Sequence, residues 1–381
     1  MTIKANPLPR PQRKKPDRGT IISAAIIAFL YIAVFVLEQI IPPSSMLFTV
    51  LKKGATYALV AVSMNLLNGF TGLFSLGQAG FMLIGAYTYA IFTIPVAQRA
   101  VVYQYFNGGL IQFTLPVFVA IILAGLASAL FAFLIGLPVL RLKSDYLAIA
   151  TLGFAEIIRS IFQWNKLGAI TNGSNMLRLF PTFNDFNIKN AQGEVVVYLS
   201  TLIPMIIAGI CIALIVMLIK STFGRALRAI KDDDIAAEAM GINLATHKQY
   251  AFCISSFFAG IGGAMLAMFA NTVQAKSFTT AMTYEILLIV VIGGIGSVTG
   301  SCISSFLFVA CSEWWLRFLD EKQMIGTFQV PFLRNGFRLV VFSLIIMIVV
   351  LFFRRGIMGT KELPDLFRRK STKTAEGGAN K

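Results

Sequence analysis

The feature that most constrains this chain is a series of apolar runs, each close to the length of a helix that crosses a bilayer. About 20 residues of α-helix span the hydrocarbon core, and helices satisfy their own backbone groups in lipid. Since 57% of the 381 residues are hydrophobic and only 13% are charged, a water-soluble domain would lack the polar surface to cover itself. We therefore predict an all-α polytopic membrane protein.

About ten runs qualify as transmembrane helices. They are Ile21–Ile41, Met46–Leu67, Ser75–Ile94, Phe113–Val139, Asp145–Phe162, Val195–Ile219, Lys248–Ala270, Thr280–Ile292, Val298–Leu319 and Gly336–Phe353. An even number puts both termini on one side. With the N-terminus inside, the cytoplasmic segments 1–19, 68–74, 140–144, 220–247 and 354–381 hold twenty Lys and Arg residues, and the opposite face is poorer. The positive-inside rule thus predicts cytoplasmic termini in the cell membrane.

These spans define the predicted domain organisation. A basic N-terminus, 1–19, precedes a transmembrane domain, 20–355, which contains a cytoplasmic loop at 220–247 and an external loop at 163–194. The polar tail 356–381 is expected to be disordered. The net charge of +16 is interpreted as a topology signal, so no nucleic-acid partner is expected. The four cysteines lie in or beside apolar runs and predict neither a disulfide framework nor a metal site.

Two glycine-rich breaks interrupt the helical pattern at membrane depth, at 68–80 and at 293–300. Irregular backbone there is stable only when it is buried in protein or lines a wet cavity. Matching breaks in two halves favour an inverted repeat around a central pathway, whereas close helix packing is the alternative. The candidate pathway residues, which could instead make helix–helix hydrogen bonds, are Asn65, Asn68, Ser75, Gln78, Gly293, Gly294, Ser297 and Thr299.

The cytoplasmic loop between the sixth and seventh spans predicts two short helices. Phe223, Leu227 and Ile230 follow helical spacing and form one apolar stripe. Asp234 can cap the second helix, which Gly241 would end. A helix this short is marginal in water, and anionic lipid would repel its three leading aspartates. We therefore predict that the loop docks on a cytoplasmic protein.

Three stretches resemble LivM-type permeases, the branched-chain amino acid subfamily of ABC importers. Phe223–Gly241 looks like the coupling loop of that family, Leu137–Arg159 is similar to its central signature, and Asn65–Gly85 resembles its Gly-rich second-to-third-span region. The resemblance implies that the loop residues couple the chain to an ATPase. They are Phe223, Gly224, Arg225, Leu227, Arg228, Asp232, Asp233, Asp234, Ala236, Ala237, Glu238 and Gly241.

The resemblance also implies an assembly. Its members would be a LivH-like sister permease, two cytoplasmic ATP-binding subunits and an extracytoplasmic substrate-binding protein. This chain would form half of a translocation pathway for branched-chain or other hydrophobic amino acids. Because the sequence has no phosphate-binding loop of the form Gly-x-x-x-x-Gly-Lys-Ser/Thr, we expect ATP to be used by the partners, and this chain to be no enzyme and to bind no cofactor.

Two alternative functions stay open. A urea or amide ABC permease would share the same signatures. A proton-coupled secondary transporter would use an intramembrane carboxylate such as Glu156 or Glu285. Glu156 and Arg159 lie one helical turn apart in the fifth predicted span, and we interpret them as a structural ion pair, with substrate contact as the alternative.

Overall fold

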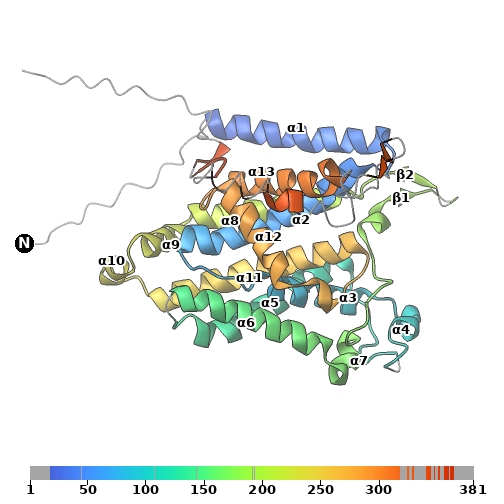
Figure 1. The fold of residues 1–381 in the computed structure, drawn as a ribbon, viewed down its shortest axis with the longest axis horizontal. Coiled ribbons are helices and arrows are strands. Elements are labelled where there is room, and N and C mark those ends of the chain that lie inside the picture. The colour runs from blue at the N-terminus through green and yellow to red at the C-terminus, as the bar shows by residue number, and fades with distance from the viewer. Residues whose placement is uncertain are drawn as a thin grey trace, which may run out of the picture.

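The computed structural model describes residues 18–317 apart from 44, 107, 143, 191 and 193, and then 324–325, 328–329, 340–344, 347, 351, 356–359 and 361–363. Long helices run alongside one another in a bundle (Figure 1). Six described helices are long and apolar enough to cross a membrane. They are α1 (Arg18–Ile40), α2 (Met46–Asn65) with its continuation η1 (Leu66–Thr71), α5 (Val117–Val139), α6 (Ser144–Gln163), α8 (Leu202–Lys220) and α11 (Leu244–Ala270). The predicted all-α polytopic membrane fold is confirmed.

Shorter elements complete the described chain. The helices inside the bundle are α3 (Gln78–Thr93), α12 (Thr280–Gly293), α13 (Val298–Val309) and the π-helix η5 (Ala310–Trp315). Those between the long helices are α4 (Val96–Val102), η2 (Asn165–Leu167), α7 (Gly168–Thr171), η3 (Phe183–Phe186), α9 (Thr222–Asp232), α10 (Asp234–Ala239) and η4 (Ala275–Ser277). Two small antiparallel pairs are β1 (Ile188–Lys189) with β2 (Val195–Val197), and β3 (Met324–Ile325) with β4 (Phe328–Gln329).

The core of the bundle lies where α3 crosses α11. A Cβ on Gly85 would lie 2.1 Å from the carbonyl oxygen of Gly260, and one on Gly263 would lie 2.0 Å from that of Met82. Only glycine permits backbones this close. Since lipid tails are as apolar as leucine, membrane helices associate largely through such close packing rather than through the hydrophobic effect. The glycines therefore determine which helices occupy the centre.

Nine of the ten predicted spans correspond to a helix in the described residues, with shifted ends. The sixth prediction was wrong at its start, because Val195–Val197 forms strand β2 and α8 begins only at Leu202. A run of β-branched residues favours a strand. The seventh helix begins at Leu244 rather than at Lys248, since the Asn243 side chain accepts the Thr246 N–H at 3.1 Å and caps it. The tenth span lies mostly outside the described residues.

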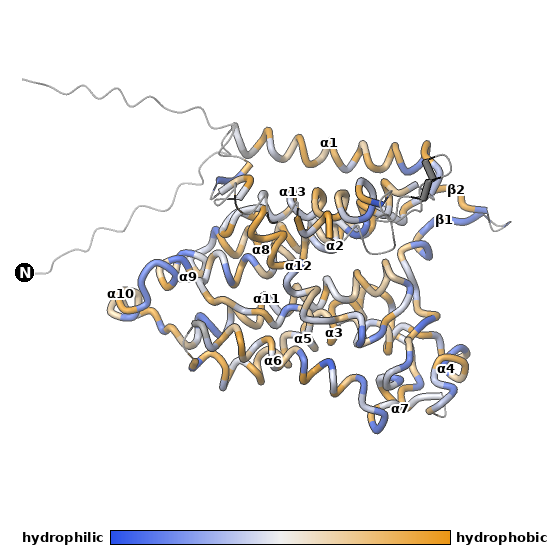
Figure 2. The backbone as a smooth tube through the Cα atoms, in the orientation of Figure 1, coloured by the Kyte–Doolittle hydropathy of each residue, from blue (hydrophilic) through white to orange (hydrophobic). Residues whose placement is uncertain are grey.

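The two ends of the bundle are polar and the middle is apolar (Figure 2). Helices α9 and α10 lie at one end, whereas α4, α7 and the β1–β2 pair lie at the other (Figure 1). The predicted cytoplasmic and external loops are thus at opposite ends, as a bilayer between them requires. The inverted repeat stays a prediction.

Candidate functional site

The predicted coupling loop forms two helices, α9 and α10, directly after α8. The Ser221 hydroxyl accepts the Gly224 N–H at 3.4 Å and caps α9. Leu227 and Ile230 are buried, and Phe223 is half-buried with its ring stacked on His247 at 5.3 Å. The predicted apolar stripe therefore attaches α9 to the end of the bundle.

Asp233, and not the predicted Asp234, caps the second helix. Its Oδ1 accepts the N–H groups of Ile235 and Ala236 at 2.9 and 3.0 Å. Asp233 has the extended backbone (φ −158°, ψ 109°) that an N-cap residue adopts, whereas Asp234 is already helical. Asp234 instead accepts a hydrogen bond from Lys248 Nζ at 2.6 Å. That ion pair joins α10 to α11.

The far surface of α10, which we call the coupling tip, is open. It consists of Ile235, Glu238 and Met240. Ile235 is 82% exposed and Met240 is 83% exposed, and Glu238 beside them is also exposed. A helix of six residues is marginal in water by itself. Large exposed apolar side chains on such a helix are typical of a surface that another molecule covers. The coupling tip has the composition of a docking site for a protein.

The two glycine breaks meet inside the bundle, and Asn65 joins them. Its Nδ2 donates to the carbonyl oxygens of Ser297 at 2.9 Å and Gly294 at 3.4 Å, and to Ser301 Oγ at 2.8 Å. Its Oδ1 accepts the Gly296 N–H at 2.8 Å. The buried side-chain amide of Asn65, at the end of α2, thus forms hydrogen bonds with the irregular backbone of the second break. We call this contact the glycine junction.

Helix α9 reaches the glycine junction directly. Lys231 Nζ donates to the carbonyl oxygen of Gly69 at 2.6 Å, and the Arg228 guanidinium lies 5.6 Å from the centre of the Phe70 ring. Gly69 lies against the second break, because a Cβ there would come within 2.6 Å of Gly296 N. The end of α9, the π-helix η1 and the loop before α13 therefore form one contiguous contact.

Comparison with known proteins identifies the family. Residues 46–354 match the family model described as branched-chain amino acid transport system / permease component. The chain belongs to this family. The LivM permease proteins of the high-affinity branched-chain amino acid transport systems of Salmonella typhimurium strain LT2 and Escherichia coli strain K12 are each 33% identical to it over 289 residues, which cover 71% of this chain.

The LivM match covers 63% of those two relatives, less than two thirds of their length. The LivH permease protein of E. coli strain K12 is 23% identical over 343 residues, which cover 86% of this chain and 98% of that protein. No solved structure matches. This member of the permease family thus resembles both kinds of permease subunit.

Most of the predicted pathway residues of this permease-family chain lie inside the subunit. Gln78 Nε2 donates to Ser63 Oγ at 2.7 Å, and Asn68 Oδ1 accepts the Ser75 N–H at 3.2 Å. Gly293 packs where α12 meets α13, since a Cβ there would lie 2.5 Å from the carbonyl carbon of Gly300. The contacts of Gln78 and Gly293 are between helices, the alternative that the sequence left open, whereas Asn68 and Ser75 bond within the first glycine break. A pathway role for these residues stays a prediction.

The sequence did not predict the contacts of residues 356–363, which it assigned to a disordered tail. Glu362 accepts the N–H groups of Val298 at 2.7 Å and Thr299 at 3.0 Å, and also the Thr299 hydroxyl. The Ile357 N–H donates to the Ile292 carbonyl at 2.8 Å. The start of that segment therefore packs on the second glycine break, and the predicted pathway residue Thr299 bonds to Glu362. The missed signal was a carboxylate in the tail, Glu362, that can cap the N-terminus of α13.

Proposed function

We propose that this chain is a membrane-spanning subunit of an ABC importer for branched-chain or other hydrophobic amino acids. It forms half of the translocation pathway and binds no nucleotide itself. Membership of the permease family and the likeness to LivM and LivH proteins support the substrate class. The observation that carries the proposal is the α9–α10 pair, which offers an exposed tip at one end of the bundle and reaches the glycine junction at its other side.

Three kinds of partner complete the proposed assembly. A LivH-like permease forms the second half of the pathway, two ATP-binding subunits lie against α10 in the cytoplasm, and a substrate-binding protein docks at the opposite end. Both termini are cytoplasmic. The opposite placement of α10 and α7 supports partners on opposite sides of the bilayer (Figure 1), and the excess of Lys and Arg in the predicted cytoplasmic segments supports the orientation. Ile235 and Met240 supply the apolar centre that such an interface needs.

The contacts of the two helices indicate how ATP-driven motion reaches the spans. A push on the coupling tip moves α10, which is tied to α11 through Asp234 and Lys248. Helix α9 moves with it and displaces η1 through Lys231 and Gly69. Asn65 then carries the displacement to the loop between α12 and α13. Since packed interfaces switch between discrete arrangements rather than bend continuously, a small shift at α10 can change the packing around both glycine breaks.

Reconstitution of the complete four-component transporter in proteoliposomes tests the proposal. We expect leucine uptake that needs ATP and the substrate-binding protein, and that a protonophore leaves unchanged. Ile235→Cys should crosslink to a cysteine on the ATP-binding subunit, whereas Val196→Cys, on an exposed residue of strand β2 at the opposite end, should not. Uptake that follows a proton gradient without ATP would instead establish a secondary transporter. Urea or amide uptake without leucine uptake would change the substrate class only.

A further inference from the structure

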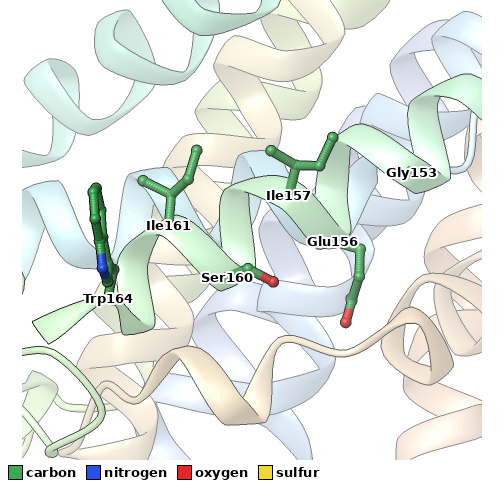
Figure 3. Close-up of a pocket in the computed structure, with 6 residues that line it drawn as sticks. All are labelled: Gly153, Glu156, Ile157, Ser160, Ile161 and Trp164. Carbon is green, nitrogen blue, oxygen red and sulfur yellow. The ribbon is translucent and has the colours of Figure 1, made fainter.

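Helix α6 has one face turned into the bundle and one left open. Leu147, Thr151, Ala155 and Ile158 are buried and face the bundle, where α6 packs mainly on α3. The opposite stripe is an open surface rather than an enclosed cavity (Figure 3). Its lining residues are Gly153, Glu156, Ile157, Ser160, Ile161 and Trp164. Five of them belong to α6 and Trp164 directly follows it, so the described part of this chain supplies only one side of any site at this surface.

An ion pair lies at the edge of the open stripe, within a membrane-spanning helix: Glu156 belongs to the stripe and Arg159 flanks it. Arg159 Nε donates to both carboxylate oxygens of Glu156, at 2.9 and 3.0 Å. The Glu156 side chain is 42% exposed and that of Arg159 is 23% exposed. Ionised side chains at membrane depth face protein or water rather than lipid. The exposed face of α5, by contrast, consists of apolar residues such as Ile122 and Leu130, which suit lipid. The open face of α6 therefore borders water or a partner.

The stripe separates polar from apolar groups along one open face. Glu156 and Ser160 point to one side of the helix, and Ile157, Ile161 and Trp164 to the other (Figure 3). An amino acid with an aliphatic side chain has the matching chemistry, with a carboxylate and an ammonium group at one end and an apolar group at the other. Arginine binds carboxylates through paired hydrogen bonds, and a glutamate accepts hydrogen bonds from an ammonium group.

We propose that this stripe of α6 is a contact site for zwitterionic amino acids with apolar side chains. Arg159 binds the carboxylate and Glu156 binds the ammonium group, while Ile157 and Ile161 cover the aliphatic chain. Without substrate the two charges satisfy each other, so neither is left unpaired in the membrane. The inference rests on the proposed import function and adds the residues that meet the substrate.

The position of the pair agrees with this role. Glu156 and Arg159 lie in the last two turns of α6, which ends at Gln163. Helix α6 leads directly into η2 and α7, at the opposite end of the bundle from α9 and α10 (Figure 1). The site therefore lies near the outer mouth of the proposed pathway, where substrate released by a binding protein arrives first.

Exchange of the two charges tests the proposal in the complete reconstituted transporter. The double variant E156R/R159E keeps an ion pair one turn apart but reverses its direction. A structural pair tolerates this reversal, whereas a binding site then presents the wrong charge to each end of the substrate. We expect normal assembly and ATPase activity stimulated by the binding protein, with leucine uptake at least tenfold lower. Uptake within twofold of wild type would overturn the proposal, as would loss of assembly, because that would show a purely structural pair.

A labelling experiment tests the same site without removing a charge. Ser160→Cys is made in a chain whose four native cysteines are replaced by alanine, with Leu130→Cys on the exposed face of α5 as the matched control. We expect a charged thiol reagent added outside to modify the first variant and not the second. Leucine should slow this modification at least fivefold, and isopentylamine, which lacks the carboxylate, should not. Equal rates with and without leucine would contradict the site.

Failure of the site and failure of the proposed function give different results. If the wild-type complex takes up leucine with ATP but both variants behave as controls, only the role of α6 is wrong. If the wild-type complex does not transport any amino acid, the import function itself is wrong.

Discussion

Replacement of Lys231 by methionine tests whether α9 moves the glycine junction. The substitution keeps the length and apolar stem of the side chain and removes the ammonium group, whose Nζ donates to the Gly69 carbonyl oxygen at 2.6 Å. Hydrogen bonds of charged groups contribute roughly 1.5–3 kcal/mol when formed inside a protein. Because Lys231 is exposed to solvent, we take the lower limit, about 1.5 kcal/mol, which corresponds to about a tenfold change in an equilibrium constant.

The free energy of the Lys231–Gly69 hydrogen bond, about 1.5 kcal/mol, limits how strongly this contact can couple α9 to the glycine junction. It lies within the usual range of about 1–3 kcal/mol for the coupling free energy between two sites. We therefore expect leucine uptake per ATP hydrolysed to fall about tenfold. The ATP hydrolysis rate itself should stay within about twofold, because the coupling tip is unchanged. Both rates are measured in the same proteoliposomes. Lys231→Arg should recover part of the uptake, since arginine keeps the charge but not the same reach.

Lys220→Met is the matched control, since Lys220 is an exposed lysine at the end of α8. It should leave the ratio of uptake to hydrolysis unchanged. Two results would refute the reasoning. One is a normal ratio in Lys231→Met. The other is an equal loss of hydrolysis and uptake, which would place the effect at the ATPase interface rather than at the junction.

Three further predictions follow from neighbouring contacts. Asn65→Ala removes an amide that pairs three backbone groups of the second glycine break and the Ser301 hydroxyl of α13. It should cost about 3 kcal/mol of stability, seen as a lower melting temperature of the detergent-solubilised subunit; an unchanged melting temperature would show that the junction is dispensable. Asp233→Ala removes the cap of α10 and should cost about 1 kcal/mol, measured as roughly fivefold weaker binding of the ATP-binding subunit, while Lys220→Met, at the end of α8, should have no such effect. Glu362→Ala should lower the melting temperature through loss of the bonds to Val298 and Thr299, and truncation after residue 363 should not.

The sequence determined those features that depend on neighbours along the chain. Apolar runs of membrane length predicted nine of the described helices, because lipid requires each segment to satisfy its own backbone. The helical spacing of Leu227 and Ile230 predicted the buried stripe of α9. Glu156 and Arg159 were predicted to pair because residues three apart on a helix are adjacent. In each case a local period or a local charge pattern was sufficient.

Only the tertiary structure decided how distant segments meet. Asn65 bonds to residues more than 200 positions away, and nothing in its local sequence separates a pathway residue from one that joins two helices. Asp233 caps α10 although Asp234 has the same side chain, because the backbone turn into the helix selects one of the three aspartates. Glu362 was assigned to a disordered tail because its partners, the N–H groups at the start of α13, are supplied by the fold. The sequence shows that a side chain can form hydrogen bonds, but only the packing of the chain determines which groups it bonds to.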